Sequence, residues 1–256
     1  MPSARLYRAE GLVLESRLMG EADLILTLFT RYCGKVRAVA RGARKPSSKL
    51  VGHLEPITRV DLAMAKGKEL DYVTQAQVVD GFQSLKSGLE GVSQGLYMAE
   101  LINGFAVEGV ANPALYSLML ETLECLPSSN AGLVLRYFEL HLLKSSGFMP
   151  ELYSCVECRS YLSPNEHRFS PGVGGTLCSS CTPAGVPLRN LSMPALKVLR
   201  FLDGTTLGGA IDLKVEPILH EELNRLLAVT ISYWLDREIR SRRFLEQLQV
   251  ARTVAV

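Results

Sequence analysis

Residues 10–41 read EGLVLESRLMGEADLILTLFTRYCGKVRAVAR, and this stretch decides how the N-terminal part of the chain folds. It contains three runs rich in Val, Ile, Leu and Thr, with breaks at Met19-Gly20 and at Cys33-Gly34. Aliphatic and β-branched residues favour strands, and a glycine between two such runs is typical of a turn. The stretch therefore predicts three consecutive strands joined by turns.

Two further runs of the same kind follow, EPITRVDLAM at 55–64 and ELDYVTQAQVV at 69–79, and Lys66-Gly67-Lys68 between them suits a short hairpin. Five short strands within about 75 residues favour a small closed barrel, because closure removes exposed sheet edges. We expect an OB-fold barrel, with an SH3-like barrel as the alternative.

After Gly81 the hydrophobic period changes to that of helices, with apolar residues at i, i+3, i+4, i+7 and i+8. One segment is apolar on nearly all sides, which predicts a buried helix. The predicted helical segments are 98–106, one that starts at Asn112-Pro113, the buried one at 131–147, one that follows Ser192-Met193-Pro194, and 219–234.

Between these helices, two Cys-x-x-Cys pairs lie 19 residues apart. The tight turn of each pair directs two sulfur atoms at one ion, and four thiolates complete a tetrahedral zinc shell. Because a catalytic zinc keeps one position open, the closed shell predicts one structural Zn²⁺, although four thiolates also hold iron. His167, between the pairs, is expected on the solvent side. The predicted ligands are Cys155, Cys158, Cys178 and Cys181.

The predicted architecture is therefore α+β. Residues 1–80 form an OB-fold domain for nucleic acid, and residues 81–256 form an α-helical domain that carries a zinc-ribbon insert at about 150–190.

The N-terminal MPSARLYRAEG lacks the basic and then apolar run of a secretory signal, and no apolar run reaches membrane-spanning length. We therefore expect a cytoplasmic protein without membrane contact, whose thiols stay reduced. In that compartment clustered cysteines indicate metal. Cys33 and Cys125 lie in apolar patterns and are expected to be packed, inert thiols.

The segment GVSQG at 91–95 matches the Gly-x-Ser-x-Gly elbow of hydrolases, but no buried strand precedes it. Ser93 is expected instead to cap the next helix. The sequence contains no Walker A loop and no His-Glu-x-x-His motif. We therefore predict that the protein is not an enzyme, with a hydrolase around Ser93 as a rival hypothesis.

The net charge is only +2, yet residues 31–49 hold seven Lys or Arg and no acidic residue. In the run from Val36 to Arg41, Arg37 and Arg41 are predicted to leave one face of a strand while the intervening even-numbered residues leave the other. A basic face followed by a basic loop predicts a groove for phosphates, whereas the alternative is a solvated charged face. Few aromatic residues accompany it, so salt-sensitive binding with little sequence preference is expected.

Residues 10–50, together with HLEP at 53–56, resemble the N-terminal OB domain of the RecO family of bacterial recombination mediators. The resemblance extends through the helical middle and the Cys-x-x-Cys pairs to SRRFLEQL at 241–248. Its specific parts are GEAD at 20–23 and AVARGARK at 38–45.

The resemblance implies a DNA repair and recombination protein that binds single- and double-stranded DNA and anneals complementary strands. With the partner RecR, members of the family help RecA to replace single-stranded DNA-binding protein, and they are not nucleases or ligases. Such a protein would be associated with the nucleoid. The implied DNA-binding residues are Lys35, Arg37, Arg41, Arg44, Lys45 and Lys49.

The resemblance also matches the four cysteines to zinc knuckles, and it implies that the helical domain receives the acidic tail of single-stranded DNA-binding protein. The arginines at 237–243 are one possible rim for that tail, and an ordinary solvated helix end is the other interpretation. The alternative function is a zinc-ribbon scaffold that binds proteins only, without annealing DNA.

Overall fold

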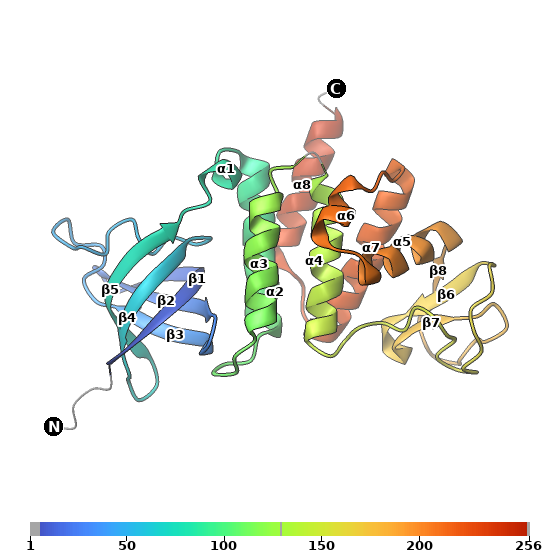
Figure 1. The fold of residues 1–256 in the computed structure, drawn as a ribbon, viewed down its shortest axis with the longest axis horizontal. Helices are drawn as coiled ribbons and strands as arrows, with labels where there is room; N and C mark the ends of the chain where they lie inside the picture. Colours follow the sequence, from blue (N-terminus) through green and yellow to red (C-terminus); the bar gives the residue numbers. More distant parts are fainter. Residues whose placement is uncertain (1–5, 129, 255–256) are drawn as a thin grey trace. The chain divides into compact units, whose positions relative to one another are not determined.

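The computed structural model describes residues 6–128 and 130–254 (Figure 1). They pack into two compact units, one formed by residues 6–124 with 239–254 and the other by residues 125–128 with 130–238. No helix in the described ranges combines the length and the apolar character that a membrane span needs.

The first unit begins with a closed five-stranded barrel in the order β1-β2-β3-β5-β4 (Figure 1). Its β3 and β5 pair in parallel, while the other neighbouring strands pair antiparallel. This is the strand arrangement of an OB-fold, and it confirms the predicted barrel and the α+β class. The strands are β1 (Leu6–Met19), β2 (Asp23–Thr30), β3 (Gly34–Ala40), β4 (Arg59–Ala65) and β5 (Asp71–Asp80).

The two faces of β3 follow the predicted alternation. Val36, Ala38 and Ala40 are buried in the barrel core, whereas Arg37 is exposed. Val39, which points to the outer face, is also buried at 5% exposure, so that face is only partly open to solvent. The apolar residues of β3 thus fix which way its basic residues point.

The segment between β3 and β4 contains turns and no helix. Ala43, Leu50 and Leu54 from this segment are buried in the same core cluster as the inner faces of the strands. The basic residues Arg44, Lys45 and Lys49 between them are exposed. The segment therefore adds three apolar side chains to the barrel core while it carries basic ones on its surface.

Four helices complete the first unit: α1 (Gln83–Lys86), α2 (Leu89–Phe105), α3 (Pro113–Cys125) and α8 (Arg240–Val254). Helix α2 packs against β1, β2 and α8. The carboxylate of Glu100 accepts hydrogen bonds from the backbone N–H groups of Arg240 and Ser241, which satisfies two free donors at the start of α8.

Ser93 does not cap a helix, so that expectation is wrong. Helix α2 begins four residues earlier, after Gly88, because the apolar pattern extends back through Leu89. Ser93 is buried at 2% exposure inside the helix, and its hydroxyl donates to the carbonyl of Leu89 at 2.6 Å. A nucleophile elbow needs a strand before the serine, and here α1 and a turn precede it.

The second unit surrounds the buried helix α4 (Ala131–Ser145), which contacts the three helices α5, α6 and α7. The expected burial of this helix is confirmed. A small sheet of order β7-β6-β8 carries the cysteine-rich segment. The remaining elements are β6 (His167–Ser170), η1 (Pro171–Val173), β7 (Gly175–Leu177), β8 (Arg189–Leu191), α5 (Met193–Gly204), α6 (Leu207–Asp212) and α7 (Pro217–Leu235).

The two compact units are defined by packing, whereas the predicted domains are parts of the chain that fold independently. The division into residues 1–80 and 81–256 therefore remains a prediction.

The turn at Gly34 leaves no room for a side chain. Gly34 has a φ of +66°, and a Cβ there would lie 2.2 Å from the carbonyl oxygen of Val110. We expect Gly34→Ala to lower the free energy of unfolding by about 2–5 kcal/mol, the sum of about 1–2 for a left-handed residue and about 1–3 for overpacking. Denaturant unfolding followed by circular dichroism measures the change.

Gly20 provides the matched control, because its φ is +62° and no atom lies within 4 Å of an added Cβ. Gly20→Ala should cost only the backbone strain, about 1–2 kcal/mol. Equal losses in the two variants would contradict the packing role of Gly34.

Candidate nucleic-acid interface and metal site

Most of the predicted DNA-binding residues lie together on the outside of the first unit. Strand β3 and the turns that follow it present five exposed basic side chains, and no carboxylate occurs within residues 31–49. We call this set the basic surface. Its members are Arg37, Arg41, Arg44, Lys45 and Lys49.

Lys35, the sixth predicted residue, is placed differently. It is half-buried, and its ammonium group donates to the carbonyl of Asn103 at 2.7 Å. Asn103 lies in the last turn of α2, where carbonyl groups lack partners within the helix and attract cations. Lys35 therefore contacts the end of a helix, and it is not counted in the basic surface.

Arg41 lies over an aromatic ring of a neighbouring strand. The central carbon of its guanidinium group is 4.7 Å from the centre of the Tyr72 ring. Tyr72 lies in β5, beside Val39 of β3. A guanidinium group held over a ring keeps its N–H edges available for hydrogen bonds with phosphate. The cation–π contact thus orients Arg41 on the sheet.

The segment that carries Arg44 is bonded to the turn between β1 and β2. The carboxylate of Asp23 accepts from the backbone N–H of Gly42 at 2.7 Å, and the carbonyl of Ala22 accepts from the N–H of Arg44 at 3.0 Å. The guanidinium group of Arg44 donates to the carbonyl of Glu21 at 3.1 Å. Residue-by-residue reasoning missed these contacts. The signal in the sequence was that GEAD at 20–23 and AVARGARK at 38–45 are both specific parts of the resemblance.

A hollow of about 410 Å³ opens beside β3, and it is lined by both acidic and basic residues. Tyr7 donates to the carboxylate of Asp71 at 2.5 Å, and the ammonium group of Lys66 lies 3.1 Å from it. Burial, together with Asp71, raises the pKa of Tyr7 above its usual range. Cys33 packs against the barrel core here, as expected. The carboxylates make this hollow a poorer phosphate site than the basic surface.

The four predicted metal ligands converge in the second unit. The ligand atoms of Cys155, Cys158, Cys178 and Cys181 all lie within 4.8 Å of one another. Each pair closes a tight turn, in which the N–H of Arg159 donates to the carbonyl of Cys155 and that of Cys181 donates to the carbonyl of Cys178. The predicted convergence of the cysteines is confirmed, and the cluster can hold a metal ion.

The chemistry of the cluster fits a soft cation. The hydroxyl of Ser160, 3.0 Å from the sulfur of Cys158, lowers the pKa of that thiol to about 6. Hydrogen bonding with the sulfur of Cys178, and then with that of Cys158, raises the pKa of Cys181 to about 12, because these bonds favour the protonated thiol. Four thiolates are a preferred ligand set for zinc.

His167 is buried at 2% exposure, so the expected solvent-side position is wrong. It lies in β6, the central strand of the small sheet, which pairs with β7 and with β8. The side chain therefore points into the unit, and burial lowers the pKa of the imidazole. His167 is not part of the cysteine cluster.

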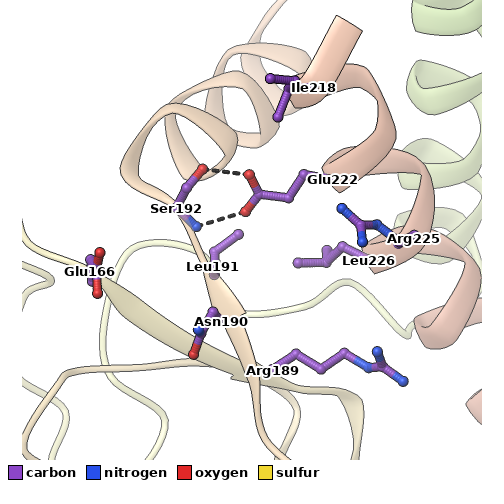
Figure 2. Close-up of a pocket in the computed structure, with 9 residues that line it drawn as sticks. All are labelled: Glu166, Arg189, Asn190, Leu191, Ser192, Ile218, Glu222, Arg225 and Leu226. Carbon is purple, nitrogen blue, oxygen red and sulfur yellow. Dashed lines mark hydrogen bonds between the residues drawn. The ribbon is translucent and has the colours of Figure 1, made fainter.

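A second hollow, of about 490 Å³, lies between β8 and α7 in the second unit (Figure 2). Figure 2 shows Glu222 turned toward Ser192, whose N–H and hydroxyl donate to the carboxylate at 2.8 and 2.7 Å. Arg189 and Arg225 also line the hollow, and Ile218 is 82% exposed. Sequence reasoning missed this site because its residues come from separate segments.

Two family models match the chain, Recombination protein O N terminal over residues 3–82 and Recombination protein O C terminal over residues 87–243. The chain belongs to the RecO family. It is 38% identical to a DNA repair protein RecO of Roseiflexus sp. (strain RS-1) over 251 residues. These residues make up 97% of this chain and 88% of that relative. DNA repair protein RecO of Dehalococcoides mccartyi (strain ATCC BAA-2266 / KCTC 15142 / 195) is 35% identical over 248 residues, 96% of this chain and 97% of the relative. The protein of that name from Desulforudis audaxviator (strain MP104C) is 35% identical over 246 residues, 96% and 98% of the two chains.

The cysteine cluster predicts the metal content of the purified protein. We expect one metal ion per chain, and we expect Cys155→Ser or Cys178→Ser to lose it, because three thiolates leave the shell incomplete. Cys33→Ser is the matched control, since Cys33 packs against the barrel core and is not a member of the cluster. Elemental analysis by mass spectrometry gives the ratio of metal to protein. Full metal content in Cys155→Ser would refute the assignment.

Proposed function

We propose that this chain is a non-enzymatic DNA repair and recombination mediator that binds single- and double-stranded DNA through the basic surface and acts at the nucleoid in the cytoplasm. The observation that carries the proposal is the set of five exposed Lys and Arg side chains on β3 and the turns after it. Membership of the RecO family and the names of the relatives, DNA repair protein RecO, support it.

The proposed mechanism is strand annealing, which needs no bond chemistry. Two DNA strands repel each other through their phosphates, and a protein that neutralises phosphates on both lowers this barrier. Base pairing then stabilises the duplex by about 1.4 kcal/mol per step, which allows the protein to release it. By the same resemblance the chain works with RecR to help RecA replace single-stranded DNA-binding protein.

Individual residues have different parts in this mechanism. Arg37 and Arg41 would contact phosphates along β3, and Arg44, Lys45 and Lys49 would extend the contact beyond the strand. Arginine binds phosphate through two parallel N–H groups, so Arg37, Arg41 and Arg44 should contribute more than the lysines. Lys35 should contribute least, because its ammonium group already contacts the end of α2.

The double variant Arg41→Ala/Arg44→Ala tests the basic surface. DNA affinity should fall for all sequences, and the slope of log K against log salt should decrease by about two, one for each lost phosphate contact. Fluorescence anisotropy with a labelled oligonucleotide measures both. Annealing of complementary strands coated with single-stranded DNA-binding protein should slow in parallel.

Lys197→Ala/Lys214→Ala is the matched control, because it removes the same charge from exposed positions of the second unit. It should leave affinity and salt slope close to those of the unchanged protein. If Arg41→Ala/Arg44→Ala leaves both quantities unchanged as well, the proposed DNA site is wrong.

The metal is proposed to be one structural Zn²⁺ held by the four cysteines, since a shell of four thiolates leaves no position for water or substrate. When bound, zinc supplies a crosslink between the two Cys-x-x-Cys turns. The strands of the small sheet have three or four residues, too few to form a stable sheet by themselves.

Chelation should therefore speed hydrogen exchange in residues 150–190 and leave the barrel strands protected. Mass spectrometry of peptic peptides with and without the chelator measures the effect. Loss of protection in the barrel strands would show that the metal supports the whole fold and is not a local clip.

The hollow of Figure 2 favours a second candidate function, binding of a protein partner. The resemblance implies the acidic tail of single-stranded DNA-binding protein as the ligand, and Arg189 with Arg225 would supply its positive rim. Arg225 also pairs with Glu221 at 3.5 Å, so it is partly neutralised. Full activity of Arg41→Ala/Arg44→Ala in the complete assembly would make a protein-binding scaffold the better assignment.

A further inference from the structure

The turns between β3 and β4 hold their exposed residues in a defined arrangement. Ala43 and Leu50 are buried on either side of the exposed basic residues, at 3% and 9% exposure. Within this span the N–H of Lys45 donates to the carbonyl of Gly42 at 3.0 Å, and the N–H of Ser48 donates to that of Lys45 at 2.8 Å. We call residues 41–50 the basic loop.

The basic loop is tied to the preceding hairpin by the three hydrogen bonds already described. Two of the acceptors are backbone carbonyls, which any sequence would supply. The third is the side chain of Asp23, whose carboxylate accepts from the N–H of Gly42 at 2.7 Å. A hydrogen bond to a charged acceptor is stronger than one to a neutral carbonyl. Of these three acceptors, Asp23 is thus the one that a substitution in the hairpin can remove.

We propose that Asp23 is a positioning residue for DNA binding, which holds the basic loop so that Arg44 and Lys45 meet phosphates in a preformed arrangement. The inference rests on the proposed function. A loop that is already ordered loses less conformational entropy on binding, and the affinity is therefore higher. Arg44 lies next to the bonded Gly42-Ala43 segment, so loss of the tether at Gly42 would reach it directly.

Positioning and electrostatics predict different changes in DNA affinity when Asp23 is replaced. Asp23 carries a negative charge close to a surface that attracts a polyanion, so electrostatics alone predicts tighter DNA binding whenever the charge is removed. Positioning predicts that the outcome depends on the replacement. Asparagine removes the charge but keeps a side-chain oxygen that can accept from Gly42, whereas alanine removes both. The two variants have equal charge and differ in the acceptor.

The first measurement is the affinity of the full chain for a fluorescent oligo(dT), with Asp23→Asn and Asp23→Ala compared at two salt concentrations. Asp23→Asn should bind as tightly as the unchanged protein or more tightly. Asp23→Ala should bind about fivefold more weakly than Asp23→Asn, the cost of ordering the released loop. Asp61→Asn and Asp61→Ala are the matched control, because Asp61 is a half-buried carboxylate in the middle of β4. These two should bind alike.

The second measurement is hydrogen exchange of residues 41–50 without DNA, which depends on the tether alone. Exchange should be faster in Asp23→Ala and close to normal in Asp23→Asn. Equal affinities of the two Asp23 variants, or equal exchange, would overturn the proposal. If instead Arg41→Ala/Arg44→Ala binds DNA normally, the proposed DNA site has failed, and the exchange measurement still shows whether Asp23 holds the loop.

Discussion

Strand β1 hydrogen-bonds with β2 along one edge and with β4 along the other, and the rest of the first unit depends on this double pairing. Its 14 residues are long enough to serve both partners, and the register shifts between Val13 and Glu15 let the strand bend. At the same point Val13 exchanges backbone hydrogen bonds with Ile57 and Thr58, just before β4. A bend of this kind allows a short sheet to close on itself. Closure in turn fixes which face of β3 points outward.

The exposure of basic residues on the outer face of β3 is a consequence of barrel closure. The chain as a whole is almost neutral. Basic side chains are nevertheless concentrated on one surface, because the apolar residues of β3 pack into the core and leave Arg37 and Arg41 outside. Several basic groups also make contacts within the protein. Arg41 lies over Tyr72, and Arg44 is bonded to the carbonyl of Glu21. Such contacts reduce the side-chain entropy that binding would otherwise remove.

The second unit depends on a different constraint. The strands of its small sheet have only three or four residues, and the four sulfur atoms of the cysteine cluster lie at the ends of two tight turns. A metal ion can replace a hydrophobic core in a segment of this size. The buried helix α4, by contrast, is held by apolar contacts with three other helices and should not need the metal. One chain thus combines a barrel closed by hydrogen bonds with an insert whose four cysteines can hold a metal ion.

The sequence by itself determined the features that repeat over a few residues. The period-two pattern of β3 predicted its inner and outer faces, and the spacing of the cysteines predicted their convergence, because both patterns are local. Only the tertiary structure decided the contacts between distant segments. The bond from Gly42 to Asp23 spans 19 residues and that from Lys35 to Asn103 spans 68. His167 was misplaced for the same reason, since its burial depends on the two strands that flank β6. No local pattern encodes such pairings, because they depend on how the barrel and the small sheet close.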